Sequence, residues 1–265
     1  MRLTSLYVPG DRPDRFAKAV ASGADAVILD LEDAVAPARK AAAREAVGVF
    51  LATAHEVPCE VRVATPADIP ALAGLPGLAA LRLPKVSSPA DVTAAAALAP
   101  GTPLHVILET AVGVESAFAI ATADPAVASI GLGEADLRSD LGVTDDAGLA
   151  WARGRVVVAA RAAGLPPPAM SVHTDLSNLD ELFATTVAGR RLGFLGRAAI
   201  HPRQLPVIEA AFRPAPAEVE RARTLLAAVS ETGGGALLPD GRFADRAMLD
   251  GARRVIALAD RPTRM

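Results

Sequence analysis

VILDL at residues 27–31 is a short, nearly continuous apolar run, and LHVILE at 104–109 and SIGLG at 129–133 have the same character. Runs of this length indicate strands that are buried on both faces, as the strands of a parallel sheet are. Helix-like stretches separate these runs along the chain, and that alternation is typical of βαβ units. The sequence therefore predicts an α/β protein built on a parallel sheet.

Eight strand-like runs alternate with helical patterns, which favours a closed (β/α)8 TIM barrel over an open sheet. The predicted strands are Leu3 to Val8, Ala26 to Leu31, Glu60 to Val63, Ala80 to Pro84, Leu104 to Leu108, Ser129 to Leu132, Ala169 to Val172 and Gly193 to Gly196. Helices are expected at 14–21, 38–53, 89–98, 114–122, 149–163, 179–188 and 206–212. A chain of 265 residues has the usual length of one such barrel, so we expect a single catalytic domain over residues 1–215.

Residues 216–265 follow the eighth unit and are predicted to form a C-terminal helical extension. Helical patterns at 217–230 and 246–258 flank ETGGGALLPDG at 231–241, which is too rich in glycine for a regular element. We interpret the extension as an arm or lid. The alternative is a plain terminal helix packed on its own barrel.

The composition is that of a globular protein, with 51% hydrophobic and 22% charged residues. A formal net charge of -3 provides no basic surface for a phosphate backbone, so no nucleic-acid partner is expected. No apolar run approaches the roughly 20 residues that span a bilayer, and we expect no membrane partner. The single cysteine, Cys59, and an N-terminus without a charged leader predict a cytoplasmic protein.

Ionisable residues follow six of the predicted strands at their carboxyl ends, where barrels of this class form their active sites. They are Asp30, Glu32, Asp33, Arg62, Lys85, Glu109, Asp136 and His173. A lone carboxylate in such a position is more often a structural ion pair or a helix cap. The recurrence of charge in six units instead predicts an active site.

Two of these carboxylates, Glu109 and Asp136, end neighbouring strands and suit Mg²⁺, which prefers oxygen ligands and keeps waters that a substrate can replace. The loop GLGEADL around Asp136 offers small residues and backbone N–H groups, at Glu134 and Ala135, as a cradle for a substrate carboxylate. The alternative is that both carboxylates simply pair with Arg62 and Lys85. Spacing alone leaves these two interpretations open.

The motifs of the chain resemble those of a known family, the HpcH/HpaI aldolases, which include the citrate lyase beta subunit, CitE-like proteins, and malyl-CoA and citramalyl-CoA lyases. The resemblance spans nearly the whole chain. It rests on LYVPGDRPDRFAKAVASGADAVILDLEDAVAP, VRV, LPKV, ILETAVGV, IGLGEADLRSDLG and GRAAIHPRQL, which occur in the family order.

The resemblance implies that Glu109 and Asp136 bind Mg²⁺ and that Arg62 holds the carbonyl oxygen that becomes an enolate. It also implies that Tyr7, Arg12 and Lys18 contact CoA, although Arg12 and Lys18 would otherwise be a solvated helix start. In lyases of this group a C-terminal Asp acts as acid/base in the active site of a neighbouring subunit, and DGRFADRAML places Asp245 at that position. A homo-oligomer, a trimer or a hexamer, follows from that arrangement.

Together these residues and motifs predict a carbon-carbon lyase. It would cleave a 3-hydroxyacyl-CoA such as malyl-, citramalyl- or hydroxymethylglutaryl-CoA into acetyl-CoA plus a 2-oxoacid, or form it from them. Mg²⁺ would polarise the oxoacid, and Arg62, which cannot lose its proton, would stabilise the enolate. The alternatives are a citrate lyase beta subunit acting on citryl-acyl carrier protein, and a catalytically silent acyl-CoA-binding regulator. Two departures from the family pattern, Ala64 where relatives carry Asn and an unassigned His173, leave substrate choice open.

Overall fold

The computed structural model describes residues 1–232, 235–238 and 241–262. It packs as two compact units, Met1–Ile208 and Glu209–Met265. The predicted glycine-rich lid segment lies partly outside the described residues, at 233–234 and 239–240. Each unit is described by itself.

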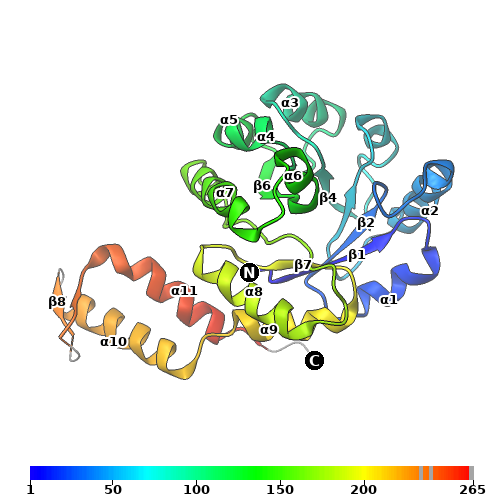
Figure 1. Ribbon diagram of the computed structural model, residues 1–265. Helices are drawn as coiled ribbons and strands as arrows, with labels where there is room; N and C mark the ends of the chain where they lie inside the picture. The colour runs from blue at the N-terminus through cyan, green and yellow to red at the C-terminus, as the bar shows by residue number, and fades with distance from the viewer. Residues whose placement is uncertain (233–234, 239–240, 263–265) are drawn as a thin grey trace. The chain divides into compact units, whose positions relative to one another are not determined.

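The first unit is built on a parallel sheet of seven strands in the order β6-β5-β4-β3-β2-β1-β7 (Figure 1). Its strands are β1 Thr4–Pro9, β2 Ala26–Asp30, β3 Cys59–Arg62, β4 Leu78–Leu83, β5 Leu104–Leu108, β6 Val127–Leu132 and β7 Arg197–Ala199. Strands β1 to β6 follow one another in chain order, and β7 pairs with β1 at the other end of the curled sheet. The predicted α/β fold of the TIM-barrel type is confirmed, with seven strands in the sheet rather than eight.

The last two predicted strands differ from expectation. The run Ala169 to Val172 forms only an isolated parallel bridge, Met170 with Arg197, and the eighth strand lies at Arg197–Ala199 rather than at Gly193 to Gly196. Gly193 and Gly196 adopt φ values of 101° and 85°, a backbone region that favours glycine and does not occur in strands. These glycines therefore make the turn before the strand instead of the strand itself.

Helices lie around the outside of the curled sheet (Figure 1). The α-helices of the first unit and its end are α1 Phe16–Val20, α2 Lys40–Leu51, α3 Pro89–Leu98, α4 Ala111–Glu115, α5 Ala117–Ala121, α6 Glu134–Leu141, α7 Ala150–Ala162, α8 Leu179–Arg191 and α9 Leu205–Phe212. Short 3-10 turns at Pro13–Arg15, Pro37–Arg39, Pro66–Ala71, Asp146–Leu149 and Pro202–Gln204 lead into or replace helices. Between β3 and β4 the chain forms such a turn, Pro66–Ala71, in place of an α-helix, and Pro70 inside it explains why no α-helix forms there.

The core consists of the buried strand side chains and the helix faces that cover them. All five residues of β2 are buried, as its continuous apolar run predicts. Inside the barrel the fully buried Glu60 forms ion pairs with Arg2 and Arg82, and His105 Nε2 lies 3.3 Å from its Oε1. These ion pairs compensate the buried negative charge of Glu60, which would otherwise destabilise the barrel.

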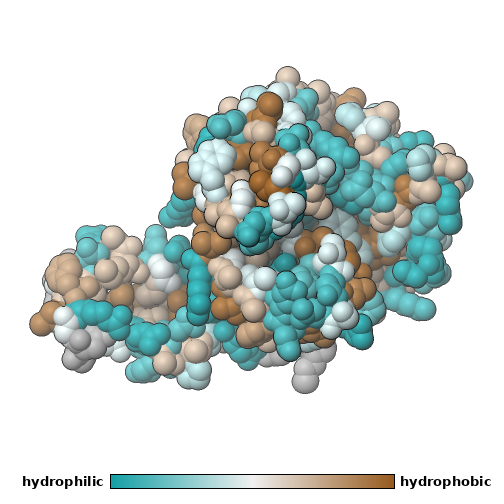
Figure 2. Space-filling view, in the orientation of Figure 1, coloured by the Kyte–Doolittle hydropathy of each residue, from teal (hydrophilic) through white to brown (hydrophobic). Residues whose placement is uncertain are grey.

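On the visible face of the barrel unit, hydrophilic and hydrophobic residues intermix (Figure 2). Large apolar side chains exposed on its helices include Val112, Trp151, Val158 and Phe183. In the described part of the chain no helix combines the length and apolar content needed to cross a membrane.

The second unit is a helical hairpin with a short antiparallel pair of strands. It contains α10 Pro216–Thr232, β8 Ala236–Leu237, β9 Phe243–Ala244, the 3-10 turn Arg246–Met248 and α11 Leu249–Ala259. The two helices predicted beyond residue 215 are thus present. That this unit acts as an arm or lid stays a prediction.

Candidate active site

The register of the parallel strands brings the charged residues together at the carboxyl ends of β2, β3, β5 and β6. Asp30 lies opposite Arg62 across β2 and β3, and Leu108 lies opposite Leu132 across β5 and β6, so the next residues, Glu109 and Gly133, are neighbours. A cavity of about 960 Å³, which also contacts residues at the amino ends of the strands such as Arg2 and His105, reaches this end of the barrel. Its lining includes the sequence-predicted Tyr7, Asp30, Asp33, Arg62, Glu109, Glu134, Ala135, Asp136 and His173.

Arg62 is held at this end of the barrel by carboxylates. Its Nε and Nη2 each donate to Asp30 over 2.7 Å, a bidentate pair, while Nη1 lies 2.9 Å from Glu32 and 3.2 Å from Asp33. The guanidinium also lies 5.1 Å from the ring centroid of Tyr7. The Asp33 side chain is 55% exposed and that of Glu32 only 7%, so Asp33 is the partner that a ligand can displace.

Glu109 is buried and closely enclosed by backbone. The Lys85 N–H donates to its Oε2 over 2.9 Å, and Gly133 approaches so closely that any Cβ there would overlap the Glu109 carboxylate. Burial, followed by the nearby charges of Glu32 and Asp136, raises the pKa of Glu109 to about 7. The carboxylate is therefore fixed in a position where its negative charge is poorly compensated.

Asp136 lies in the first turn of α6 and lines the cavity. In the part of the chain that the structure describes, neither Asp136 nor Glu109 has an ion-pair partner within 4.0 Å; Arg62 pairs with Asp30, Glu32 and Asp33, and Lys85 Nζ with Glu32 at 3.1 Å. Glu109 and Asp136 therefore do not pair with Arg62 and Lys85, contrary to the alternative interpretation of the sequence.

The side chains present fit a hydrated Mg²⁺. Glu32 Oε2 is buried and accepts no hydrogen bond from the described residues, although Arg62 Nη1 is close to it. Over residues 1–232, 235–238 and 241–262 no three His, Cys, Asp or Glu side chains form a complete metal cage. Mg²⁺ in proteins is usually bound by one or two carboxylates and several waters. Glu109 and Asp136, two carboxylates without a cationic partner, would suit such a hydrated ion.

The predicted carboxylate cradle lies at the start of α6. The Glu134 side chain does not face a ligand, because Arg153 donates to both of its oxygens over 2.9 and 2.6 Å. What remains for a ligand at Glu134 and Ala135 is the backbone of the first helical turn, whose N–H groups lack partners within the helix. The Glu134 N–H lies 3.3 Å from the Ser171 hydroxyl.

Two of the other predicted contacts, Arg12 and Lys18, are not among the residues that line the cavity. Arg12 donates both Nε and Nη2 to Asp14 over 2.9 Å, and Lys18 is exposed on α1. Asp245 caps the turn Arg246–Met248 in the second unit by accepting from Ala247 N over 3.0 Å. The roles of Tyr7, Arg12, Lys18 and Asp245 toward CoA or the reaction stay predictions.

His173 and Ala64, the two departures from the family pattern, both lie in defined surroundings. His173 lines the cavity, its carbonyl oxygen accepts from Gln204 Nε2 over 2.8 Å, and its buried Nε2 has no hydrogen-bond partner among the described residues. Ala64 donates its N–H to Asp68 Oδ2 over 3.0 Å at the start of the turn after β3.

Sequence reasoning missed the residues that hold the site in shape. Ser171 is uncharged, Arg153 lies within α7, and Arg197 is the first residue of β7 instead of following a strand, so the pattern of charges after strands does not identify them. Lys85 is the one described non-glycine residue with a positive φ, 55°, and no sequence signal marks it. Gly133 lies within the motif GLGEADL, and a glycine directly after a predicted strand is a usable signal that another group approaches the backbone closely.

The positive φ of Lys85 indicates a strained backbone at this residue. Replacing Lys85 by Gly should give a protein more stable than Lys85→Ala by roughly 0.5 to 1 kcal/mol, because a Cβ is disfavoured at positive φ. Denaturant unfolding measures the difference. At the exposed helical position Ala94 the preference should reverse, with Gly less stable; a Lys85→Gly variant that is less stable than Lys85→Ala contradicts the prediction.

A curled parallel sheet with carboxylates and a fixed arginine at its carboxyl ends defines a barrel enzyme with an acidic, cation-binding site. The chain belongs to the HpcH/HpaI aldolase/citrate lyase family, whose model matches residues 3–202. Members of this family include CoA-ester lyases.

Three relatives illustrate the similarity. A "(3S)-malyl-CoA thioesterase" from Cereibacter sphaeroides is 37% identical over 96% of this chain and 93% of that protein. The "L-malyl-CoA/beta-methylmalyl-CoA lyase" of Rhodobacter capsulatus is 30% identical over 96% and 93%. The crystal structure of CitE from Mycobacterium tuberculosis in complex with magnesium, acetoacetate and coenzyme A is 33% identical, with a TM-score of 0.85 over 98% of each chain.

Proposed function

We propose that this protein is a Mg²⁺-dependent CoA-ester lyase that cleaves, or forms, the carbon-carbon bond between a thioester α-carbon and a 2-oxoacid. The observation that carries the proposal is the cavity that Glu109, Asp136 and Arg62 line together. Burial and the nearby charges of Glu32 and Asp136 raise the pKa of Glu109 there, so its negative charge lacks a compensating cation. The substrate class is a 3-hydroxyacyl-CoA of the malyl or citramalyl type, with hydroxymethylglutaryl-CoA, which would release the 3-oxoacid acetoacetate, as a related substrate.

Glu109 and Asp136 are the residues that would hold the metal. When bound, Mg²⁺ supplies Lewis-acid polarisation of the oxoacid oxygen. The relative from M. tuberculosis is described with magnesium, acetoacetate and coenzyme A, which supports the same ligands here. The fixed orientation of Glu109 by Lys85 N–H and Gly133 favours this role, because a first ligand must not rotate away from the metal.

Arg62 is the group that stabilises the thioester enolate. Asp30 fixes Nε and Nη2, so Nη1 is the donor that can change partners. We infer that the thioester oxygen replaces Asp33 on Nη1, because Asp33 is the exposed partner. A guanidinium stays protonated throughout, so it supports the negative oxygen without neutralising it.

The oxoacid carboxylate would bind the first turn of α6 at Ala135, where helix N–H groups point outward. In cleavage a general base takes the proton of the substrate hydroxyl, the oxoacid carbonyl forms as the carbon-carbon bond breaks, and the resulting enolate carbon takes a proton to give acetyl-CoA. Asp245 is our candidate for that last proton transfer, supplied by the arm of a second copy in a homo-oligomer, a trimer or a hexamer.

A second candidate is thioester hydrolysis, favoured by the 37% identity to the protein named (3S)-malyl-CoA thioesterase. In that reaction water attacks the thioester carbonyl, and the products are free CoA and the hydroxy acid. A citrate lyase beta role on citryl-acyl carrier protein and a silent acyl-CoA-binding role are the remaining alternatives.

The test is a product assay with purified protein, using malyl-CoA, citramalyl-CoA and hydroxymethylglutaryl-CoA. We expect acetyl-CoA and the matching oxoacid (glyoxylate, pyruvate or acetoacetate, respectively) to form with Mg²⁺. EDTA should reduce the rate at least about a hundredfold because the polarising cation is removed. Added Mg²⁺ should restore it. Free CoA with malate would indicate the thioesterase, and cleavage that persists in EDTA would overturn the proposed metal role.

A further inference from the structure

The barrel wall is incomplete beside β6, and one serine bridges the gap. The segment at 168–170 pairs with β7 and its preceding turn through backbone hydrogen bonds, from Met170 N to Gly196 O over 2.9 Å and from Ala198 N to Met170 O over 3.1 Å. On its other side, toward β6, the hydrogen bonds among the described residues run through the side chain of Ser171.

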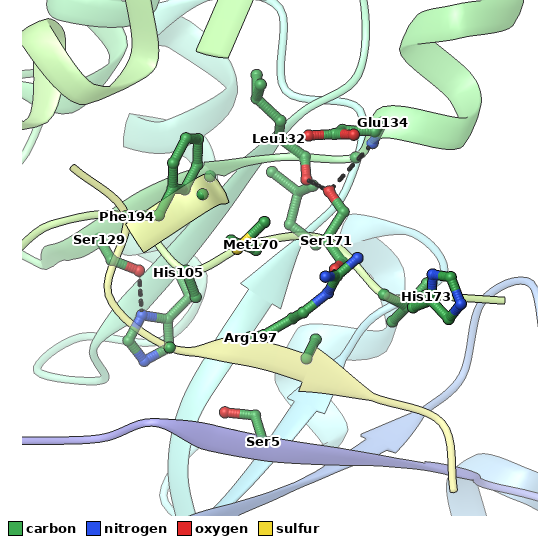
Figure 3. A pocket seen from close by; sticks show the side chains of 18 of the residues that line it. Ser5, His105, Ser129, Leu132, Glu134, Met170, Ser171, His173, Phe194 and Arg197 are labelled. Carbon is green, nitrogen blue, oxygen red and sulfur yellow. Dashed lines mark hydrogen bonds between the residues drawn. The ribbon is translucent and has the colours of Figure 1, made fainter. Parts of the chain in front are cut away.

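The Ser171 hydroxyl uses both of its hydrogen-bonding capacities there. It donates to Leu132 O, the last residue of β6, over 2.6 Å, and it accepts from the Glu134 N–H at the start of α6 over 3.3 Å (Figure 3). These two partners flank Gly133, the residue that encloses Glu109. The hydroxyl therefore spans the turn that leads from the strand into the helix carrying Asp136.

Ser171 is itself held in place by Arg197 on β7. Arg197 lies beside Ser171 (Figure 3), and its Nε donates to Ser171 O over 3.0 Å. Its Nη1 donates to the hydroxyls of Thr185 and Thr186 on α8 over 2.8 Å each. Arg197 is buried, and no described carboxylate lies within ion-pair distance of it. Its bonds go to neutral oxygens that fix the bridging segment to the helix layer.

We propose that Ser171 is a positioning residue for the metal and oxoacid site. The inference rests on the Mg²⁺-dependent activity proposed above. Through Leu132 and Glu134 the hydroxyl sets the geometry of the turn 132–136, and thereby the position of Asp136 and of the N–H groups at the start of α6. Hydrogen-bonded partners of this kind orient metal ligands elsewhere, and their loss weakens metal binding roughly 10- to 100-fold.

The decisive comparison is Ser171→Thr against Ser171→Val, which have the same shape and differ in the hydroxyl. Mn²⁺ is the probe, because it takes the same oxygen ligands as Mg²⁺ and its binding can be followed by electron paramagnetic resonance without substrate. We expect Ser171→Thr to bind Mn²⁺ like the wild type and Ser171→Val to bind it about tenfold more weakly. Ser177→Ala, at an exposed serine nearby in the chain, serves as the control.

A kinetic readout separates positioning from general destabilisation. Assayed in the bond-forming direction at temperatures where all variants are folded, Ser171→Val should raise the KM for the 2-oxoacid more than that for acetyl-CoA. Equal Mn²⁺ affinities for the threonine and valine variants would overturn the inference while leaving the proposed function intact. A wild-type protein that binds no Mn²⁺ would overturn both.

Discussion

Glu109→Gln is expected to reduce turnover of the hydroxyacyl-CoA on the order of a thousandfold, and Asp136→Asn to do the same. Each change keeps the size of the side chain and removes the charge that holds the cation. The measurement is kcat for cleavage at saturating Mg²⁺, with Mn²⁺ binding as a second readout. Asp91→Asn, at a helix cap outside the cavity, is the control and should keep the wild-type rate.

The same Glu109→Gln change should make the metal-free protein more stable. Burial and the neighbouring Glu32 and Asp136 raise the pKa of Glu109 from 4.5 to about 7, so ionising it in the folded state costs free energy. That cost grows as the pH rises from the unfolded pKa and is fully present above about pH 7. At pH 8 without metal, the variant should therefore melt above the wild type.

Addition of Mg²⁺ should reverse the order, because only the wild type gains stability from the cation. In a domain of this size each 1 kcal/mol corresponds to about 2 to 4 °C in Tm. Thermal melts with and without Mg²⁺ measure both effects. A Glu109→Gln protein that retains turnover, or that gains as much stability from Mg²⁺ as the wild type, is incompatible with Glu109 as a ligand.

The barrel was predictable because its strands carry a strong local signal. A run such as that of β2 is apolar on both faces, and charge directly follows it, so both the strand and the site residues at its end stand out in the sequence. The signal fails where an element is short or polar. Helix α6 buries only Leu137, so no apolar period marks it.

The weaker parts of the barrel show what a pattern cannot supply. The glycines at 193 and 196 look apolar with their neighbours Phe194 and Leu195, yet their positive φ values make a turn. The segment at 169–172 is apolar enough for a strand, but its pairing on one side depends on the Ser171 hydroxyl rather than on a ladder. Neither fact follows from periodicity.

At the site, the sequence identified the charges but not their partners. Arg62 and Lys85 could have neutralised Glu109 and Asp136; instead Arg62 is engaged by Asp30, Glu32 and Asp33, and Lys85 by Glu32. Which carboxylate a cation selects depends on side-chain reach across strands, a property of the three-dimensional register. That selection leaves the metal pair without a cation and gives the acidic site its proposed function.

Gly133→Ala should inactivate the protein nearly as fully as loss of Glu109, although the substitution adds a single methyl group. A Cβ at Gly133 would overlap the Glu109 side chain, which Lys85 N–H holds from the other side, so the carboxylate must leave its position. We expect kcat to fall at least about a hundredfold, since a displacement near 1 Å at a reacting group has that effect. Overpacking should also cost about 1 to 3 kcal/mol of unfolding free energy.

Gly131→Ala, two residues earlier and within β6, is the matched control, because a Cβ there would meet only Ala169 O at 3.7 Å, an ordinary contact. The cause can be isolated by a double-mutant cycle. If the Glu109 side chain is what the new methyl group meets, Gly133→Ala should lose most of its stability cost in a Glu109→Ala background, where that space is empty. An unchanged cost there would mean that the β6–α6 turn itself, and not the enclosed carboxylate, requires glycine.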